Sequence, residues 1–186
     1  MAASPESARK EELLEVASAL FLRFGYRKTS MDDVARGAGL SRQGLYLHFR
    51  SKEALFVEAL EFLMSRTNSG IQAALEDPAG SLEDRLLGAF DAYKGAFVTY
   101  GMNAVAMDEL LEASQRLVGD RVTDFQASFI QRLAEEMRPV ERKGISAESM
   151  AEVLYAVSAG LKFRVDDRNE YRRIMRNAIR LLVLGN

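Results

Sequence analysis

The chain has 186 residues, 48% of them hydrophobic, which is enough to bury a core in one domain or in two small ones. It contains no cysteine, which excludes disulfides, thiol catalysis and thiolate-bound metals. The formal charge of −2 conceals an asymmetry: seven basic and two acidic residues lie between 23 and 52, a local charge of +5, so the remainder carries −7. A basic patch on an acidic body is typical of a DNA-binding protein, although a solvated charged face is the alternative interpretation.

The beginning of the chain, MAASPESARKEELLEV, carries charges where a secretion signal would be continuously apolar. No apolar run approaches the length of about 18 residues that a membrane span needs. We therefore expect a cytoplasmic protein. Apolar residues recur with a helical period almost throughout and strand-like alternation is absent, which predicts an all-α fold of about nine helices.

Four helices are expected in the first third of the chain. The first covers residues 5–24 and ends before Gly25. The second is capped by Thr29 or Ser30 and ends near Ala38, and its first turn holds two acids that complement the helix dipole. The third covers 41–49, and the fourth is capped by Ser51 and runs to about residue 66 or beyond.

Residues 31–50, MDDVARGAGLSRQGLYLHFR, predict two short helices joined by a tight turn. Gly39 follows the first helix, where a left-handed residue is needed, and Ser41 offers a hydroxyl to cap the second. The apolar inner face is formed by Val34, Ala35, Leu40, Leu45 and Phe49. The outward side chains are Arg42, Gln43, Gly44, Tyr46, Leu47 and His48. This pattern predicts a helix-turn-helix whose second helix can enter a major groove.

The clearest break in the chain is DPAGS at residues 77–81. Beyond it, we expect helices at about 82–100, 104–115, 118–137, 147–165 and 167–184, the third of which is terminated by Pro139. There is no internal repeat and no low-complexity segment. The remainder of the chain therefore predicts a helical bundle.

With these motifs placed, residues 9–63 resemble the N-terminal domain of TetR/AcrR-type transcriptional regulators. The resemblance rests on FxxxGYxxTS followed by VAxxAGLSxxxLYxHFxSKEAL, and it covers about a third of the chain. It implies a helix-turn-helix DNA-binding domain at 1–52 and a ligand-binding and dimerisation domain at 53–186. It also implies a homodimeric repressor that binds a pseudo-palindromic operator in double-stranded DNA, is released by a small-molecule effector and needs no cofactor.

By the same resemblance, the candidate DNA contacts are Thr29, Ser30, Ser41, Arg42, Gln43, Gly44, Tyr46, Leu47, His48 and Lys52. Arg42 and Gln43 suit guanine and adenine, while Gly44 would allow close backbone approach and Leu47 a thymine methyl contact. Many relatives carry threonine and an aromatic residue at these last two positions. Lys52 opposes the dipole of the fourth helix, which a phosphate bound at that helix start would explain; a surface lysine tolerated at a small cost is the alternative. Tyr46 and His48 have alternative roles in packing and in structural hydrogen bonding.

A set of aromatic and methionine residues is the candidate pocket for a largely hydrophobic effector, with ordinary core packing as the alternative. It consists of Phe62, Tyr93, Phe97, Tyr100, Met107, Phe125 and Phe129. The candidate dimer interface consists of Val157, Gly160, Leu161, Ile174, Ala178 and Leu182, with intrachain packing as the alternative. The arginines at 172, 173, 176 and 180 are interpreted as the solvated side of the last helix.

A ligand-responsive repressor is the leading hypothesis. The first alternative is a helical enzyme or small-molecule carrier with a vestigial DNA-binding head, and the second is a non-specific, nucleoid-type binder. The single histidine and the lack of cysteine argue against an enzyme and against a metal site.

Overall fold

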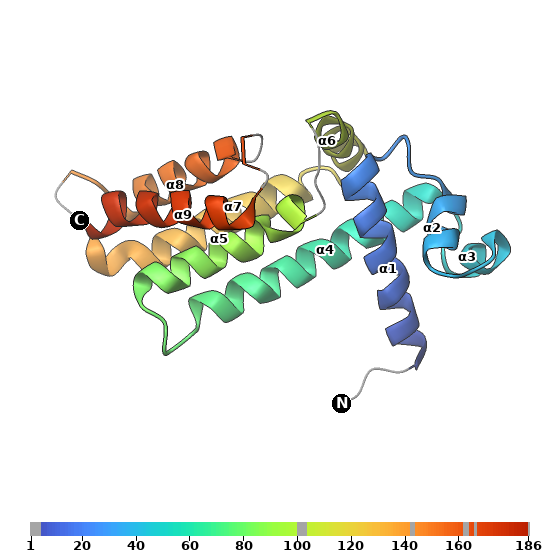
Figure 1. The fold of residues 1–186 in the computed structure, drawn as a ribbon, viewed down its shortest axis with the longest axis horizontal. Coiled ribbons are helices and arrows are strands. Elements are labelled where there is room, and N and C mark those ends of the chain that lie inside the picture. Colours follow the sequence, from blue (N-terminus) through green and yellow to red (C-terminus); the bar gives the residue numbers. More distant parts are fainter. Residues whose placement is uncertain (1–4, 100–103, 142–143, 162–163, 166, 186) are drawn as a thin grey trace. The chain divides into compact units, whose positions relative to one another are not determined.

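A computed structural model describes residues 5–99, 104–141, 144–161, 164–165 and 167–185. Over these ranges the chain forms nine α-helices and two short helical turns, without any strand, which confirms the all-α prediction (Figure 1). None of the helices described is long and apolar enough to cross a membrane.

The chain divides into two compact units, one made of Met1–Arg66 and Tyr100–Asp120, the other of Thr67–Thr99 and Arg121–Asn186. This grouping differs from the sequence-based division at residue 52, because residues 100–120 join the N-terminal helices and a single long helix runs from one unit into the other. The assignment of DNA binding to 1–52 and of ligand binding to 53–186 stays a prediction.

The first unit, which we call the head, contains α1 (Pro5–Phe24), α2 (Met31–Gly37), α3 (Arg42–His48), the start of α4 (Lys52–Leu75) and α6 (Ala104–Val118). Helix α1 packs against α2 and α6, and α2 packs against α3. Three aromatic rings form the junction with α4: the Phe56 ring lies 5.1 Å from Phe21 and 5.0 Å from Tyr26, edge to face in both cases. The predicted bounds of the first three helices are confirmed to within two residues.

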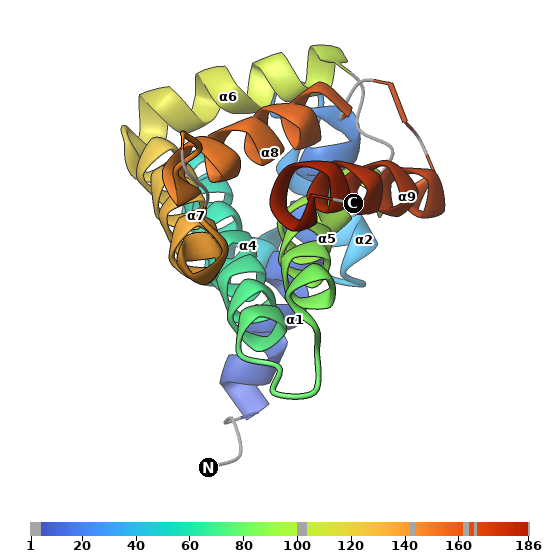
Figure 2. The same ribbon diagram turned by 90° about the vertical axis from the view of Figure 1, so that its left-hand side faces the viewer.

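The second unit, which we call the body, contains the end of α4, α5 (Leu82–Thr99), α7 (Arg121–Met137), α8 (Ala147–Leu161) and α9 (Arg168–Ile179). Two short turns follow α7 and α9: η1 (Arg138–Val140) and η2 (Arg180–Leu184). Helix α8 packs against α7 and α9, and α5 closes the ring by contacting α7 and α9 (Figure 2). The core of this ring includes Phe90, Phe129 and Met150, each no more than 1% exposed.

Three of the four arginines that the sequence placed on a solvated side, Arg172, Arg176 and Arg180, form ion pairs with another helix, whereas Arg173 is exposed as expected. These three arginines and Arg168 pair with acids on α5, which lie about eighty residues or more away in the chain. Arg168 binds both carboxylate oxygens of Asp91 at 2.9 and 2.7 Å, and Arg172 binds the same carboxylate. One helical turn or more further along, Arg176 and Arg180 contact Glu83 at 3.1 and 2.7 Å. Arginines spaced four residues apart along α9 and into η2 therefore form a row of ion pairs with Asp91 and Glu83, which we call the charged seam between α5 and α9.

Candidate nucleic-acid interface

Helix α2 begins with a capping box. The Ser30 hydroxyl accepts a hydrogen bond from the Asp33 amide at 3.2 Å, and the Asp33 carboxylate accepts from the Ser30 amide at 3.0 Å. These bonds satisfy two backbone donors that a helix start would leave unpaired. The Ser30 hydroxyl and backbone hold the pKa of Asp33 below its ordinary value, so the cap is ionised at neutral pH.

The turn after α2 has the hydrogen bonds of a Schellman motif. Leu40 donates to the Ala35 carbonyl at 2.8 Å and Gly39 donates to the Arg36 carbonyl at 3.2 Å. Gly39 has a φ of +65°, a left-handed conformation that other residues adopt only at a cost. The turn predicted from this glycine is thereby confirmed, and it fixes the direction in which α3 leaves α2.

Helix α3 is anchored on one side and exposed on the other. Ser41 caps it by accepting from the Gly44 amide at 3.0 Å, and Leu45 and Phe49 are at most 1% exposed. The opposite face presents Arg42, Gln43, Tyr46, Leu47 and His48, all exposed, with Leu47 at 84%.

Arg42, at the first position of α3, is contacted by two other side chains. Its guanidinium donates to the Asp32 carboxylate of α2 at 2.9 Å and lies 5.7 Å from the centre of the Tyr46 ring, one helical turn further on. Hydrogen bonding to Tyr46 and the charge of Asp32 raise the pKa of Arg42. Arg42 and Tyr46 are predicted DNA contacts, whereas Asp32 is predicted from the sequence only as an acid in the first turn of α2.

Thr29 differs from the other candidate contacts because it is only 2% exposed. Its hydroxyl donates to the Gly25 carbonyl at 2.8 Å and lies 3.2 Å from the Leu20 carbonyl. Thr29 therefore ties the loop before α2 to the end of α1. In this conformation its hydroxyl does not face solvent, where a phosphate would lie.

Lys52 is half-buried and folded back on the head. Its ammonium donates to the Arg27 carbonyl at 3.3 Å and lies 4.4 Å from the centre of the Tyr26 ring. Burial lowers the pKa of Lys52, while Glu53 and Glu109 oppose that shift. The Tyr26 hydroxyl donates a hydrogen bond to Glu53 at 3.1 Å. Burial is the main cause that raises the pKa of Tyr26, and the Glu53 carboxylate raises it further.

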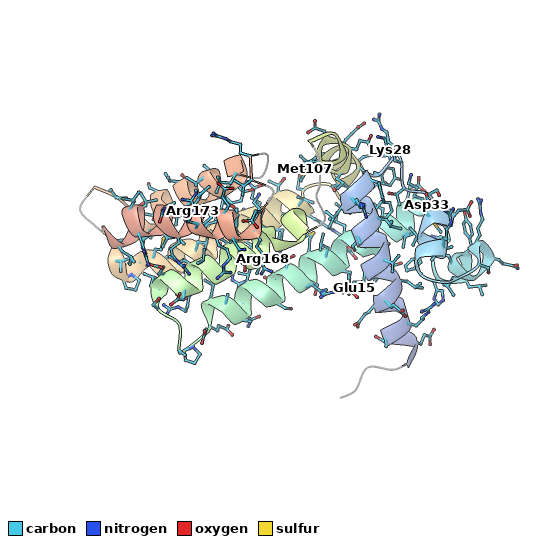
Figure 3. All side chains as sticks on the ribbon, in the orientation of Figure 1. Glu15, Lys28, Asp33, Met107, Arg168 and Arg173 are labelled. Atoms are coloured by element: carbon cyan, nitrogen blue, oxygen red, sulfur yellow. The ribbon has the colours of Figure 1, made fainter. Side chains whose placement is uncertain are left out.

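The loop between α1 and α2 also contacts α6. The Arg27 amide donates to Glu109 at 3.2 Å and the Arg27 guanidinium to Glu112 at 2.7 Å. The sequence analysis did not connect these acids with the basic segment. A separate surface hollow between α1 and α2 is lined by Leu20, Phe24, Lys28, Thr29, Asp33, Arg36 and Gly37 (Figure 3 labels Lys28 and Asp33). Both features belong to the head.

The candidate pocket residues are divided between the two units. Phe62 and Met107 belong to the head, and Tyr93, Phe125 and Phe129 to the body; Tyr100 and the Phe97 side chain lie outside the described residues. In the body, the Tyr93 ring stacks on Phe129 at 4.2 Å and on Phe125 at 5.9 Å. Sequence reasoning missed Lys94, which is 5% exposed and whose ammonium lies 5.7 Å from the Tyr93 ring centre.

The candidate dimer residues lie on α8, α9 and η2. Val157, Leu161, Ile174, Ala178 and Leu182 are partly buried against the core of the body. Gly160 is exposed, and a Cβ atom built there would meet nothing within 4 Å. Two large apolar residues outside the predicted set are more exposed: Val153 at 48% and Leu181 at 72%.

Among the described residues, no group of three or more histidine, cysteine, aspartate or glutamate side chains is placed to hold a metal ion. The lone histidine, His48, is exposed on α3, and the centre of its ring lies 6.3 Å from the centre of the Phe49 ring.

Comparison with known proteins agrees with this geometry. Residues 13–59 match the sequence model of the family described as bacterial regulatory proteins, tetR family. The regulator EthR of Mycolicibacterium smegmatis is 29% identical over 106 residues, covering 57% of this chain and 49% of the relative. The repressor KstR2 of Mycobacterium tuberculosis is 38% identical over 86 residues, covering 46% of this chain and 42% of the relative. The matches thus span about half or less of these relatives.

Solved structures share the fold along nearly the whole chain. A TetR regulator from Legionella pneumophila superposes with a TM-score of 0.76 at 17% identity, covering 98% of both chains. A putative TetR-family regulator from Rhodococcus gives 0.72 at 21% identity, covering 95% of this chain and 100% of that one. The family match in the head, the sequence relatives and the fold shared with these structures support a transcriptional regulator of the TetR family.

Proposed function

We propose that this chain is a ligand-responsive transcriptional repressor that binds a pseudo-palindromic DNA operator as a homodimer in the cytoplasm. The observation that carries the proposal is helix α3, whose apolar side is anchored by Leu45 and Phe49 while its opposite side exposes arginine, glutamine, tyrosine and histidine. A short anchored helix with such side chains matches the size and chemistry of the DNA major groove.

The proposed contacts fall into two groups. Arg42 and Gln43, at the start of α3, read base edges, with the backbone at Gly44 and the Leu47 side chain close by. Ser41, Tyr46, His48 and Lys52 contact phosphates, which orient the head without carrying sequence information. Ser30 contributes through its position at the exposed start of α2, and Thr29 contributes indirectly, by holding the preceding loop.

The proposed dimer forms through α8 and the end of the chain. The exposed apolar side chains Val153 and Leu181 extend the predicted set, and the open surface at Gly160 permits close approach of a second helix. A two-fold dimer is the commonest assembly of soluble proteins and matches the symmetry of a palindromic operator. Sedimentation that gives a monomer at micromolar concentration would contradict this part of the proposal.

The proposed effector is small and largely hydrophobic, because the aromatic residues Tyr93, Phe125 and Phe129 lie together in the body. The solved relative KstR2 is described as a ketosteroid transcriptional regulator, so steroids belong among the compounds to test. Thermal unfolding with neutral apolar compounds and with polar anions as the matched control tests this class. A melting temperature that rises for the anions alone would contradict a hydrophobic effector.

The decisive experiment for the proposed function measures affinity for two duplexes at about 150 mM salt, where non-specific contacts are weakened. One duplex is selected by the protein from a random-sequence pool, and the other has the same length and composition in shuffled order. Tight binding to the selected duplex alone supports the repressor. Equal affinity favours the nucleoid-type binder, and no binding favours the carrier or enzyme.

Two variants separate base contacts from phosphate contacts. Arg42→Ala is expected to weaken binding to the selected duplex by about 1–3 kcal/mol and to relax one base position. Lys52→Ala is expected to weaken binding to both duplexes alike and to lower the slope of log affinity against log salt by about 1. An equal loss on both duplexes for Arg42→Ala would identify its contact as a phosphate.

A further inference from the structure

Asp32 places a carboxylate on the surface of the head that, in the proposed function, approaches DNA phosphates. The carboxylate accepts a hydrogen bond at 2.9 Å from Arg42, a residue on the next helix. Arg42 also lies 5.7 Å from the centre of the Tyr46 ring. The arginine best placed to read a base thus contacts a carboxylate of one helix and an aromatic ring of another.

Helix capping does not explain this carboxylate, and the helix dipole explains an acid in this turn but not its pairing with Arg42. The Asp32 and Arg42 side chains are 46% and 62% exposed, and exposed ion pairs contribute little to folding. The capping role at the start of α2 already belongs to Asp33, which closes the box with Ser30. A negative charge at this place also repels DNA, which lowers affinity for every sequence.

We propose that Asp32 is a positioning residue that makes DNA recognition by Arg42 sequence-selective; this inference rests on the proposed function. One N–H of the planar guanidinium is directed to Asp32, which leaves another edge for the two parallel hydrogen bonds that guanine O6 and N7 accept. Asp32 also competes with phosphates for Arg42. It therefore strengthens the correct base contact by pre-organising the arginine and weakens binding to all other DNA.

The test compares affinities for the selected and the shuffled duplex, with the ratio of the two dissociation constants as the readout. Asp32→Asn is expected to bind the shuffled duplex more tightly than the wild type does. The ratio of the two dissociation constants is expected to fall by about threefold to tenfold, which is part of the discrimination that one bidentate base contact supplies. Residues in direct contact give coupled effects. In the Arg42→Ala background, the same substitution is therefore expected to leave the ratio unchanged.

Asp33→Asn is the control for charge, because it removes the same charge from the same helical turn and its side chain pairs with Arg36 instead of Arg42. The amide oxygen of asparagine can still accept the Ser30 hydrogen bond that closes the capping box. This control variant is expected to raise affinity for both duplexes without changing their ratio. Asp32→Glu keeps the carboxylate and is expected to restore part of the ratio. Thermal unfolding of each variant tests whether the head is folded. If Asp32→Asn does not fold, the ratio measured for Asp32→Glu decides the result.

The outcomes separate this inference from the proposed function. The inference is overturned if Asp32→Asn and Asp33→Asn change the ratio equally, or if the effect of Asp32→Asn persists without Arg42. A pool from which the wild type enriches no sequence overturns the proposed function itself, and the role of Asp32 with it. An enriched sequence with an unchanged ratio in Asp32→Asn overturns the role of Asp32 alone.

Discussion

The charged seam between α5 and α9 provides a quantitative test of how the body is held together. Asp91 is 6% exposed, and its two oxygens accept hydrogen bonds from Arg168 and Arg172, residues on α9 (Figure 3 labels Arg168). Burial by itself would raise the pKa of Asp91, but the Arg168 hydrogen bonds and the charges of both arginines outweigh it and lower the pKa. The substitution Asp91→Asn tests this arrangement because it keeps one acceptor oxygen and the side-chain volume.

The expected cost follows from the contacts. A hydrogen bond to a charged group is worth about 1.5–3 kcal/mol when buried, but the two arginine side chains are 58% and 37% exposed, which reduces that value. Replacing one oxygen by an amide NH₂ also directs a donor at cationic donors. We therefore expect a loss of about 2 kcal/mol in the free energy of unfolding, or about 4–8 °C in melting temperature for a protein of this size.

The lowered pKa of Asp91 predicts how its contribution to stability changes with pH. Because the folded-state pKa of Asp91 is lowered, its contribution is complete above the ordinary aspartate pKa of about 4 and is lost as the pH falls through the lowered value. The difference in stability between wild type and Asp91→Asn is thus constant from about pH 8 to pH 5 and shrinks below about pH 4.

Thermal and urea unfolding followed by circular dichroism measure this difference. The control is Glu170→Gln, whose 52% exposed side chain lies 3.6 Å from Arg173 and is expected to change stability by less than about 0.5 kcal/mol. A melting temperature that is equal in wild type and Asp91→Asn at pH 7 would refute the reasoning. So would a difference that grows as the pH falls.

Three further predictions concern the head. Gly39→Ala is expected to lower the free energy of unfolding in urea by about 1–2 kcal/mol because φ is +65°. A Cβ there would meet no atom within 4 Å, so backbone strain is the whole cost. The control Gly160→Ala, in open helical surroundings, should be neutral or stabilising. Thr29→Val should lose about 1 kcal/mol of stability while leaving the salt slope of DNA binding unchanged; a lower slope would mean that Thr29 contacts a phosphate after all. In a spectrophotometric titration, the phenol that disappears in Tyr26→Phe should ionise above pH 10, and ionisation below that value would contradict its burial beside Glu53.

Local sequence determined most of the fold. The apolar period located the helices, and the break at 77–81 is confirmed by the end of α4 at Leu75 and the start of α5 at Leu82. Gly39 and Ser41 located the turn and cap of the helix-turn-helix, because these features depend on residues only a few positions apart. The exposed face of α3 could be predicted for the same reason, since one buried residue per turn fixes the direction of all the others.

Contacts between distant residues required the tertiary structure. Asp91 and Arg168 are far apart in sequence, and the sequence therefore left the arginines of α9 as a solvated face. The burial of Thr29, the return of Lys52 to the Tyr26 ring and the pairing of Asp32 with Arg42 likewise depend on how neighbouring helices pack. Periodicity states which side of a helix is buried, but the partner of a charged side chain is decided only when two helices are brought to a definite angle and register.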